Sequence, residues 1–521
     1  MASSEGLSGL PSTIRTVADI PRYYASRSPD AIALSFEGRE TNFRDLDAVS
    51  NRVANGLLAT DVRPAGRVAI LDKNMDLFFQ ILLGAAKVRA VLVPINARLA
   101  PPEIAFAIND AGAEVLFVGE PFVEIISAIH EQLDTVRQII VLNGIYAKWR
   151  DAQEDSDPGL PVSPEDICLQ LYTSGTTGYP KGVQLSHVNL ALHAHDKWRA
   201  WSPDDVLLLV MPLFHIAGCG TGIFGLMAGL KVVVLREFVP LQTLEMIQRT
   251  RATVAFLVPA MLLAMLAERD VDKFDVSSLR HVLYGASPIP IELLRQSLLV
   301  FKHTNFFQVY GLTETTGVIT VLAPEDHFPS DREVLRSCGR PVKGVELRII
   351  DAEGRALPPR QVGEILCRTS QNTKGYWNRA DDTAKVLKNE WLHTGDAGFL
   401  DENGYLYIHD RLKDMIVSGG ENVYPAEIES ALYGHPDIAD VAVIGVPDDK
   451  WGEAVKAVIV LKPDRAADAP GILLFARQRL AGFKVPKSIE FVSDLPRNPA
   501  GKILKRTLRE RYWQGYERGV N

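Results

Sequence analysis

Residues 171–182 read LYTSGTTGYPKG, a run that holds three glycines, three threonines, one serine and a single lysine. Such a run cannot form hydrophobic core, because it offers little apolar surface and its glycines lose much conformational freedom on folding. Glycines let a backbone approach an oxyanion closely, hydroxyls and amides donate to that anion, and Lys181 can neutralise its charge. The stretch therefore predicts a phosphate-binding loop, with a plain surface loop as the alternative.

The flanks of this loop predict the local fold. Residues 167–173 (ICLQLYT) alternate like a strand, and Ser186 can cap a following helix. We therefore expect a strand, then the loop, then a helix. The loop is not of the Walker A type, because only two residues separate Gly175 from Gly178 and a proline precedes the lysine.

Outward from the loop, short apolar runs alternate with stretches of helical periodicity. Parallel sheets covered by helices on both faces produce this rhythm. We therefore predict an α/β fold in which a large N-terminal domain contains several α/β sheet subdomains. The apolar runs expected to form strands are residues 68–71, 91–95, 113–118, 138–142, 206–210, 231–235, 252–258 and 279–285.

The pattern changes in the last third of the chain. Residues 345–410 contain shorter strands with turn signals, and the Asn-Gly pair at 403–404 is a strong hairpin signal, so a β-rich subdomain is expected. We divide the chain into an N-terminal domain (1–412) and a small, mobile α+β C-terminal domain (413–521), with a hinge near Lys413. In the C-terminal unit, helices are expected at 426–432 and 471–480 and strands at 441–444 and 454–460.

Composition narrows the class of protein. A chain of 521 residues exceeds what one core accommodates, and 47% hydrophobic with 23% charged residues is ordinary globular usage. Because 64 acidic residues outnumber 56 basic ones, the formal charge of -8 disfavours nucleic acid and anionic lipid as partners. The four cysteines form no CxxC pair and are expected to be reduced thiols.

Membrane and secretion signals are missing from the sequence. The N-terminus lacks the cationic start and apolar run of a signal peptide. The longest apolar run, residues 254–266, is too short to span a bilayer and contains a proline. We therefore expect a cytoplasmic protein without integral membrane contact.

Five further motifs follow the glycine-rich loop. They are MPLFHIAG from Met211, YGLTE from Tyr310, TGD from Thr394, DRLKDMI from Asp410 and PAGKILK from Pro499. Together with YTSGTTGYPKG, and in this order over nearly the whole chain, they resemble the adenylate-forming enzymes. That superfamily contains acyl-CoA and aryl-CoA synthetases, the adenylation domains of peptide synthetases, and firefly-type luciferases. Six motifs in the same order make coincidence very improbable.

The resemblance implies an activity in two halves. A carboxylic acid attacks the α-phosphate of ATP and releases pyrophosphate, and the acyl-adenylate then reacts with a thiol. The implied substrates and cofactors are a small carboxylic acid, ATP, Mg²⁺ and coenzyme A. Because the two halves need different groups at one reacting centre, the small domain should move, and in this family it rotates about the position that matches Lys413.

Four residues receive catalytic roles from the resemblance. Lys502, in a Pro/Gly loop before a helix, matches the family's adenylation lysine, although a solvated lysine is the alternative because other basic residues are nearby. Thr313 supplies a hydroxyl to the α-phosphate, and Glu314 is the carboxylate that binds Mg²⁺. His215 orients the acid's carboxylate, although a lone histidine among apolar residues is more often a core residue.

The resemblance also implies the surface that binds the nucleotides. Tyr310 should lie on the adenine, with Gly285 and Ala286 leaving room for the ring. Asp396 fits the ribose hydroxyls with help from Arg411; a packed tyrosine and an ordinary ion pair are the alternatives. The loop residues expected at the phosphates are Thr173, Ser174, Gly175, Thr176, Thr177, Gly178 and Lys181. The set is completed by Gly311, Gly419 and Gly420, and by Trp451 and Phe483 as contacts for coenzyme A.

The acid pocket is expected to be lined by the residues after His215. They carry no cation before Lys231, which disfavours a second carboxylate, and their many glycines suggest room for something long or flat. A medium- or long-chain fatty acid is therefore predicted, with benzoate- or cinnamate-type acids as the alternative. A non-catalytic relative that binds nucleotide or acyl ligand, and a luciferase-like oxidation, stay open.

The thiol acceptor is expected to be coenzyme A, because the chain does not continue into a carrier domain with a modified serine. The sequence gives no indication of the oligomeric state.

Overall fold

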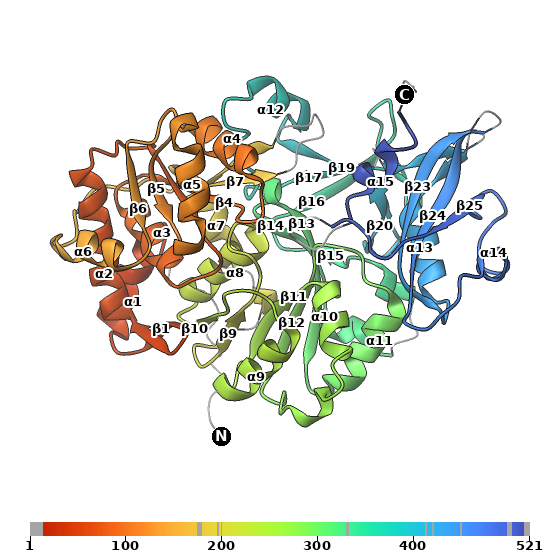
Figure 1. Ribbon diagram of the computed structural model, residues 1–521, viewed down its shortest axis with the longest axis horizontal. Coiled ribbons are helices and arrows are strands. Elements are labelled where there is room, and N and C mark those ends of the chain that lie inside the picture. Colours follow the sequence, from red (N-terminus) through yellow and green to blue (C-terminus); the bar gives the residue numbers. More distant parts are fainter. Residues whose placement is uncertain are drawn as a thin grey trace.

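The computed structural model describes residues 14–173, 180–194, 197–199, 201–329, 333–411, 414–418, 421–448, 451–497 and 503–514 (Figure 1). Within these ranges the chain forms four β-sheets with the helices that cover them. This mixed architecture confirms the predicted fold class: a large N-terminal part with two α/β sheets and a β-rich subdomain, followed by a smaller α+β part.

The largest sheet has nine strands in the order β15-β14-β13-β12-β11-β9-β10-β1-β2. The strands from β13 to β1 are parallel, whereas β14, β15 and β2 are antiparallel to their neighbours. Burial on both faces explains why the parallel strands read as nearly unbroken apolar runs. The strands are β1 Ile32–Phe36, β2 Arg39–Asn42, β9 Val206–Leu209, β10 Lys231–Val234, β11 Val254–Leu257, β12 His281–Gly285, β13 Asn305–Leu312, β14 Gly317–Leu322 and β15 Arg340–Pro341.

The second sheet has six strands in the order β6-β5-β3-β4-β7-β8, all parallel except β8. The strands are β3 Arg67–Leu71, β4 Val91–Ile95, β5 Ala113–Val118, β6 Gln138–Val141, β7 Ile167–Thr173 and β8 Lys181–Ser186. Every apolar run that the sequence predicted as a strand is therefore a strand of one of these two sheets.

The fold around the glycine-rich run differs from the prediction. The chain does not pass from the loop into a helix, because β8 pairs antiparallel with β7 and α7 (His187–Ala194) begins only after it. The two large apolar residues of β8, Val183 and Leu185, are buried and lie two positions apart, a strand signal that the helix-cap signal at Ser186 concealed. Ser186 does cap α7, since its hydroxyl accepts a hydrogen bond from the Asn189 N–H at 3.4 Å. Strands β7 and β8 thus form an antiparallel pair.

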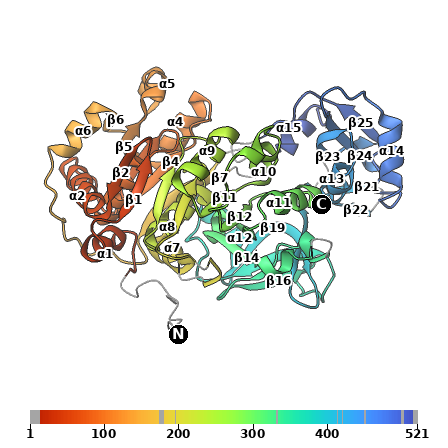
Figure 2. The same cartoon turned by 90° about the horizontal axis from the view of Figure 1, so that it is seen from below.

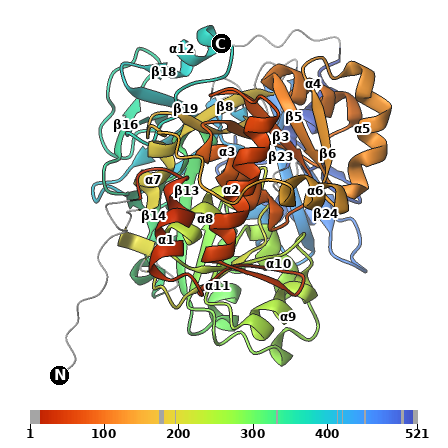
Figure 3. The same ribbon diagram turned by 90° about the vertical axis from the view of Figure 1, so that its left-hand side faces the viewer.

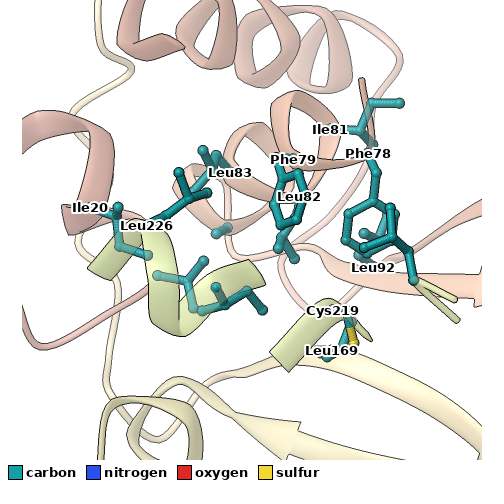
Figure 4. Packing of buried hydrophobic residues seen from close by; sticks show 14 of the residues in the cluster. Ile20, Phe78, Phe79, Ile81, Leu82, Leu83, Leu92, Leu169, Cys219 and Leu226 are labelled. Atoms are coloured by element: carbon teal, nitrogen blue, oxygen red, sulfur yellow. The ribbon is translucent and has the colours of Figure 1, made fainter. Parts of the chain in front are cut away.

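Two helices, α3 (Leu77–Lys87) and α8 (Ile216–Met227), are packed between the two sheets. Nearly all residues of both helices are buried, and most of them are apolar, as expected of helices enclosed by other elements. Figure 4 shows the resulting cluster, in which Leu83 of α3 lies near Leu226 of α8, and Cys219 of α8 lies near Leu169 of β7. This shared core makes the two sheets one N-terminal body.

Other helices cover the outer faces of the sheets. Figure 3 shows α4 and α5 beside β5 and β6 of the second sheet. The helices over the outer face of the nine-stranded sheet are α9 Pro240–Thr250, α10 Pro259–Leu266 and α11 Ile291–Val300. The remaining helices of the two-sheet body are α1 Asp19–Arg27, α2 Phe43–Ala59, α4 Pro101–Ala111, α5 Val123–Ile129 and α6 Gly144–Asp151.

The β-rich subdomain has a sheet of its own. Its five strands follow the order β16-β17-β19-β18, with β20 paired to β19. The predicted hairpin joins β19 to β20, and the Asp401 carboxylate closes it by accepting hydrogen bonds from the N–H groups of Asn403 and Tyr405, both at 2.9 Å. The elements are β16 Glu346–Ile350, β17 Gly363–Arg368, α12 Ala380–Val386, β18 Leu387–Lys388, β19 Trp391–Leu400 and β20 Leu406–Arg411.

The C-terminal unit has its own five-stranded sheet and lies at one end of the molecule (Figure 2). Separate apolar clusters fill its two faces, one with α13 and α14 and the other with α15. Lys413, the predicted hinge, lies outside the described residues, so rotation of this unit stays a prediction. The elements are β21 Ile416–Ser418, β22 Glu421–Val423, α13 Pro425–Tyr433, β23 Ile438–Asp448, β24 Gly452–Leu461, α14 Ala469–Arg477, β25 Ser488–Phe491 and α15 Lys505–Glu510.

Two further expectations agree with the structure. In the described part of the chain, no helix has the length and apolarity needed to cross a membrane. The four cysteines are free thiols, and Cys168, Cys219 and Cys367 are buried.

Two buried histidines make the stability of the fold sensitive to acid. Burial lowers the pKa of His187 and of His215 from 6.5 to about 4. The unfolded chain therefore takes up protons at higher pH than the folded one. The stabilising contribution of the two neutral imidazoles is complete above pH 6.5 and is lost as the pH falls through 4, at a cost on the order of 3 kcal/mol for each histidine.

We expect the midpoint temperature of unfolding to drop between pH 6.5 and pH 4, and His187→Gln to make that drop smaller. Nδ1 of His187 accepts a hydrogen bond from the Val17 N–H at 3.1 Å, and a glutamine oxygen can replace this acceptor without titrating. Scanning calorimetry at several pH values measures, for the wild type and for the variant, how steeply the midpoint temperature changes with pH. Equal slopes for wild type and variant would contradict the expectation.

Candidate active site

The YGLTE motif forms a tight turn at the carboxyl end of a parallel strand. β13 runs to Leu312, Thr313–Thr315 make one turn of 3₁₀ helix, and β14 returns antiparallel. Gly311 cannot be larger, because a Cβ there would lie 1.6 Å from the carbonyl oxygen of Gly317. In open α/β sheets, ligands bind at the carboxyl ends of the parallel strands. The turn therefore presents Thr313 and Glu314 at the edge where a ligand is expected.

The YGAS segment ends the neighbouring strand, β12. Gly285 pairs with Val309 of β13, and a Cβ on Gly285 would lie 2.0 Å from the Val309 carbonyl oxygen. Ala286 follows with φ of 62°, a left-handed conformation that is costly for a residue with a Cβ. The structure thus places Gly285 and Ala286 beside the strand that carries Tyr310, as the adenine hypothesis requires.

Tyr310 and Asp396 are in direct contact. The Tyr310 hydroxyl donates to the Asp396 carboxylate at 2.6 Å, although Asp396 comes from β19 of the β-rich subdomain. Asp396 is buried, and in the backbone register it pairs with Arg411 of β20. The fold therefore brings the residues expected at the adenine and the ribose together from two sheets.

Lys181 is the first residue of β8 and pairs in register with Thr173 at the end of β7. Its ammonium group forms an ion pair with the Asp382 carboxylate at 2.9 Å, and this hydrogen bond lowers the pKa of Asp382. The Lys181 side chain is only 12% exposed. The expected phosphate ligands Ser174, Gly175, Thr176, Thr177 and Gly178 lie outside the described residues.

Glu314 has a partner that the sequence did not indicate. The hydroxyl of Tyr376 donates to Oε1 of Glu314 at 2.9 Å, and the Thr373 N–H donates to the Glu314 carbonyl oxygen at 2.7 Å. The described residues contain no group of three or more His, Cys, Asp or Glu side chains that could hold a metal. A single carboxylate beside substrate phosphates is nevertheless a common way to bind Mg²⁺, so Glu314 fits that ion.

His215 precedes α8 and packs its ring against Phe214 at 4.7 Å between centroids. Burial lowers the pKa of His215 to about 4, so the imidazole is neutral near pH 7. Its Nε2 atom is buried and has no hydrogen-bond partner among the described residues. A buried nitrogen without a partner is costly in a folded protein, which favours a ligand contact over a core role for His215.

The glycines of α8 do not leave the space that the sequence suggested. A Cβ would lie 2.1 Å from the Pro212 carbonyl oxygen at Gly218, 2.4 Å from the Phe79 ring at Gly222, and 2.7 Å from Leu207 at Gly225. These three glycines therefore let the helix pack closely against its neighbours. Only Gly220 faces another way, toward Ile216 and Phe224 of its own helix.

The fold also adds a cation near this helix. The segment after His215 carries none of its own before Lys231, but the guanidinium of Arg199 lies 4.9 Å from the ring centroid of Phe224 and 4.5 Å from that of Trp198. Arg199 is buried. The contact joins residues far apart in the sequence, so no local pattern could reveal it.

In the C-terminal unit, two exposed aromatic rings have lysines over them. Trp451 and Phe483 are each 39% exposed, with the Lys487 ammonium 5.7 Å from the Trp451 ring centroid and the Lys484 ammonium 5.6 Å from that of Phe483. This arrangement suits a base that stacks beside phosphates. The predicted residues Lys502, Gly419, Gly420 and Lys413 lie outside the described part of the chain.

Comparisons with known proteins identify the family of this chain. The family model described as AMP-binding enzyme matches residues 22–377, and that of the AMP-binding enzyme C-terminal domain matches residues 427–502. The fatty acid–[acyl-carrier-protein] ligase ScoC of Streptomyces coeruleorubidus is 40% identical over 98% of this chain and 98% of its own. The feruloyl-CoA synthase of an Amycolatopsis species is 39% identical over 94% of this chain and 97% of its own.

A solved structure extends the agreement to three dimensions. The anthranilate CoA ligase AuaEII in complex with anthranoyl-AMP superposes with a TM-score of 0.90 at 30% identity, covering 96% of this chain and 98% of that one. Family models and full-length relatives thus span both parts of the molecule. The chain belongs to the AMP-binding enzymes of the adenylate-forming superfamily, and it is an AMP-forming acid–thiol ligase.

Proposed function

We propose that this ligase activates a medium- or long-chain fatty acid as its acyl-adenylate and transfers the acyl group to coenzyme A. The observation that carries the proposal is the apolar face of α8 that follows His215. His215 stands at its start, and Ile216, Gly220 and Phe224 share one face of the helix. A Cβ on Gly317 would lie 3.8 Å from Ile216, so this apolar face begins beside the Glu314 turn. An alkyl chain that leads away from the reacting carboxylate suits such a face.

In the first half-reaction, the acid and the phosphates must approach although both are anions. The neutral imidazole of His215 can donate one N–H to the acid's carboxylate. Thr313 donates its hydroxyl to the α-phosphate, and Lys181 and Lys502 supply positive charge where negative charge grows. Glu314 would hold Mg²⁺, which when bound neutralises phosphate charge. Tyr310 and Asp396 hold the adenosine through the ring and the carboxylate.

In the second half-reaction, the thiol replaces AMP on the acyl carbon, and the loop that carries Lys502 has to leave the reacting centre. The Arg509 side chain of α15 donates to the Asp414 carboxylate at 2.6 Å, and both side chains are almost fully buried. This ion pair ties the helix after Lys502 to the segment after Lys413. A rotation about Lys413 would therefore carry Lys502 with the whole C-terminal unit.

Coenzyme A is the proposed acceptor because Trp451 and Phe483 are exposed aromatic rings with lysines over them. Such rings suit the adenine and phosphates of a nucleotide. The relative ScoC is named for transfer to an acyl-carrier protein instead. Assays with free coenzyme A and with a phosphopantetheinylated carrier protein separate the two acceptors. Thioester formation with the carrier protein alone would overturn this part of the proposal.

An aromatic acid is the second candidate, and one observation favours it. The rings of Trp198, Trp201 and Phe224 lie around the Arg199 guanidinium, at 4.5, 5.5 and 4.9 Å from ring centroid to guanidinium carbon. The ring of Phe307 lies 5.8 Å from that of Trp198. Relatives named for feruloyl and anthranilate substrates belong to the same family. Such a cluster could receive a flat ring.

The substrate class is tested by acid- and CoA-dependent AMP release from MgATP. The panel contains straight-chain acids of increasing length, benzoate-type acids and cinnamate-type acids. We expect kcat/KM to rise with chain length to an optimum, because each buried methylene adds about 0.8 kcal/mol of transfer free energy. A higher kcat/KM for the benzoate- or cinnamate-type acids than for every straight-chain acid would instead identify the enzyme as an aryl-CoA ligase.

A further inference from the structure

Residues 373–377 (TKGYW) form a segment that we call the strap. The strap runs along β8, the strand that leaves the glycine-rich loop. The Gln184 N–H donates to the Gly375 carbonyl oxygen at 2.9 Å, and the Trp377 N–H donates to the Gly182 carbonyl oxygen at 2.8 Å. Tyr376 forms a β-bridge with Val183. The backbone of the strap is therefore fixed to the strand that begins with Lys181.

The strap also forms hydrogen bonds to the turn that contains Glu314. The Thr373 N–H donates to the Glu314 carbonyl oxygen at 2.7 Å, and the Tyr376 hydroxyl donates to the Glu314 carboxylate at 2.9 Å. Thr316, two residues on, donates its hydroxyl to the Gln371 carbonyl oxygen at 2.6 Å. The strap thus joins β8 of one sheet to the YGLTE turn of another.

Tyr376 is the one residue of the strap whose side chain contacts both charged groups in the described structure. The ammonium of Lys181 lies 5.3 Å from the centroid of its ring, and the hydroxyl bonds to Glu314. The Tyr376 N–H donates to the Thr383 hydroxyl at 2.9 Å, which fixes the backbone from a third direction. Asp382, next to Thr383, forms the ion pair with Lys181.

We propose that Tyr376 is a positioning residue for the binding of MgATP. Its hydroxyl orients the Glu314 carboxylate, and its ring supports the Lys181 ammonium, so the two opposite charges face the phosphates and do not pair with each other. The inference rests on the proposed roles of Glu314 and Lys181. A carboxylate held by a hydrogen bond loses less side-chain freedom when it binds a cation, so the hydroxyl should strengthen Mg²⁺-dependent binding of ATP.

The test uses Tyr376→Phe, which keeps the ring and removes the hydroxyl. Titration calorimetry of ATP at a series of Mg²⁺ concentrations measures binding without turnover. We expect the variant to need a roughly tenfold higher Mg²⁺ concentration than the wild type to reach half of its maximal ATP affinity. Loss of a hydrogen bond to a charged group changes an equilibrium constant by about that factor or more. Thioester formation from supplied acyl-adenylate should stay at the wild-type rate, because that step uses neither Glu314 nor Lys181.

Tyr172→Phe is the matched control. The Tyr172 hydroxyl also donates to a carboxylate, that of Asp110 at 2.8 Å, and Tyr172 lies on β7 opposite Gly182 of β8. In the described structure no hydrogen bond joins Tyr172 to Glu314 or to Lys181. Its substitution should leave the Mg²⁺ dependence of ATP binding unchanged. An equal change of the Mg²⁺ dependence in both variants would overturn the inference, because it would mean that either substitution loosens the β7–β8 pair as a whole.

Other outcomes separate this inference from the proposed function. A wild-type Mg²⁺ dependence in Tyr376→Phe overturns the positioning role, even if the wild-type enzyme activates acids as proposed. A wild-type protein that binds MgATP but activates no acid overturns the proposed function, while the calorimetric comparison still decides the role of Tyr376. A wild-type protein that binds no MgATP overturns both.

Discussion

Lys502→Ala should abolish acyl-adenylate formation while leaving thioester formation from supplied acyl-adenylate largely intact. The lysine is expected to offset negative charge at the α-phosphate only in the first half-reaction. Loss of one such group in a closed site lowers the rate by roughly 10²–10³-fold. Acid-dependent exchange of pyrophosphate into ATP measures the first half-reaction, and release of AMP from supplied acyl-adenylate and coenzyme A measures the second.

Lys505→Ala provides the control for that experiment. Lys505 is three residues further on, at the start of α15, but its ammonium is paired with the Glu429 carboxylate at 2.9 Å. Loss of this ion pair should lower the stability of the protein but leave the ratio of the rates of the two half-reactions unchanged. If Lys502→Ala slowed both half-reactions equally, Lys502 would have a structural role and not a charge-balancing one.

Glu314→Gln should lower the rate of adenylation by roughly 10²-fold, because an amide keeps the shape of the side chain but does not offer Mg²⁺ an anionic oxygen. The amide oxygen can still accept from the Tyr376 hydroxyl, so the fold of the turn should persist. Raising the Mg²⁺ concentration should restore part of the rate in the pyrophosphate exchange assay.

Glu325→Gln is the comparison for this substitution. Glu325 is an exposed acid just after β14 and should tolerate the change. A Glu314→Gln enzyme with wild-type rate and wild-type Mg²⁺ requirement would exclude Glu314 as the metal ligand.

Most of the fold was predictable because its signals are local. Buried parallel strands read as apolar runs, and the Asn-Gly pair at 403–404 specified the hairpin between β19 and β20. In the C-terminal unit, α13, α14, β23 and β24 were predicted for the same reason, whereas the short strands β21, β22 and β25 were not predicted. The error at β8 also has a local cause, since a short strand next to a helix cap contains two competing signals.

The site was predictable only in part. Motifs identified Tyr310 and Asp396, but their hydrogen bond joins two sheets and is visible only in three dimensions. Tyr376 was missed because its hydrogen-bond partner, Glu314, lies 62 residues away in the sequence. Arg199 was missed because the ring that it contacts, Phe224, belongs to a different helix. The glycines of α8 were misread because the sequence does not tell whether a missing side chain leaves a cavity or permits close packing.

The central claim is that this chain uses ATP to activate a carboxylic acid at the site formed by Lys181, Tyr310, Glu314 and Asp396. Exchange of labelled pyrophosphate into ATP, measured with and without a straight-chain fatty acid, tests it most directly. We predict exchange that requires both the acid and Mg²⁺ and that disappears in Lys502→Ala. No exchange with any straight-chain or aromatic acid would contradict the claim.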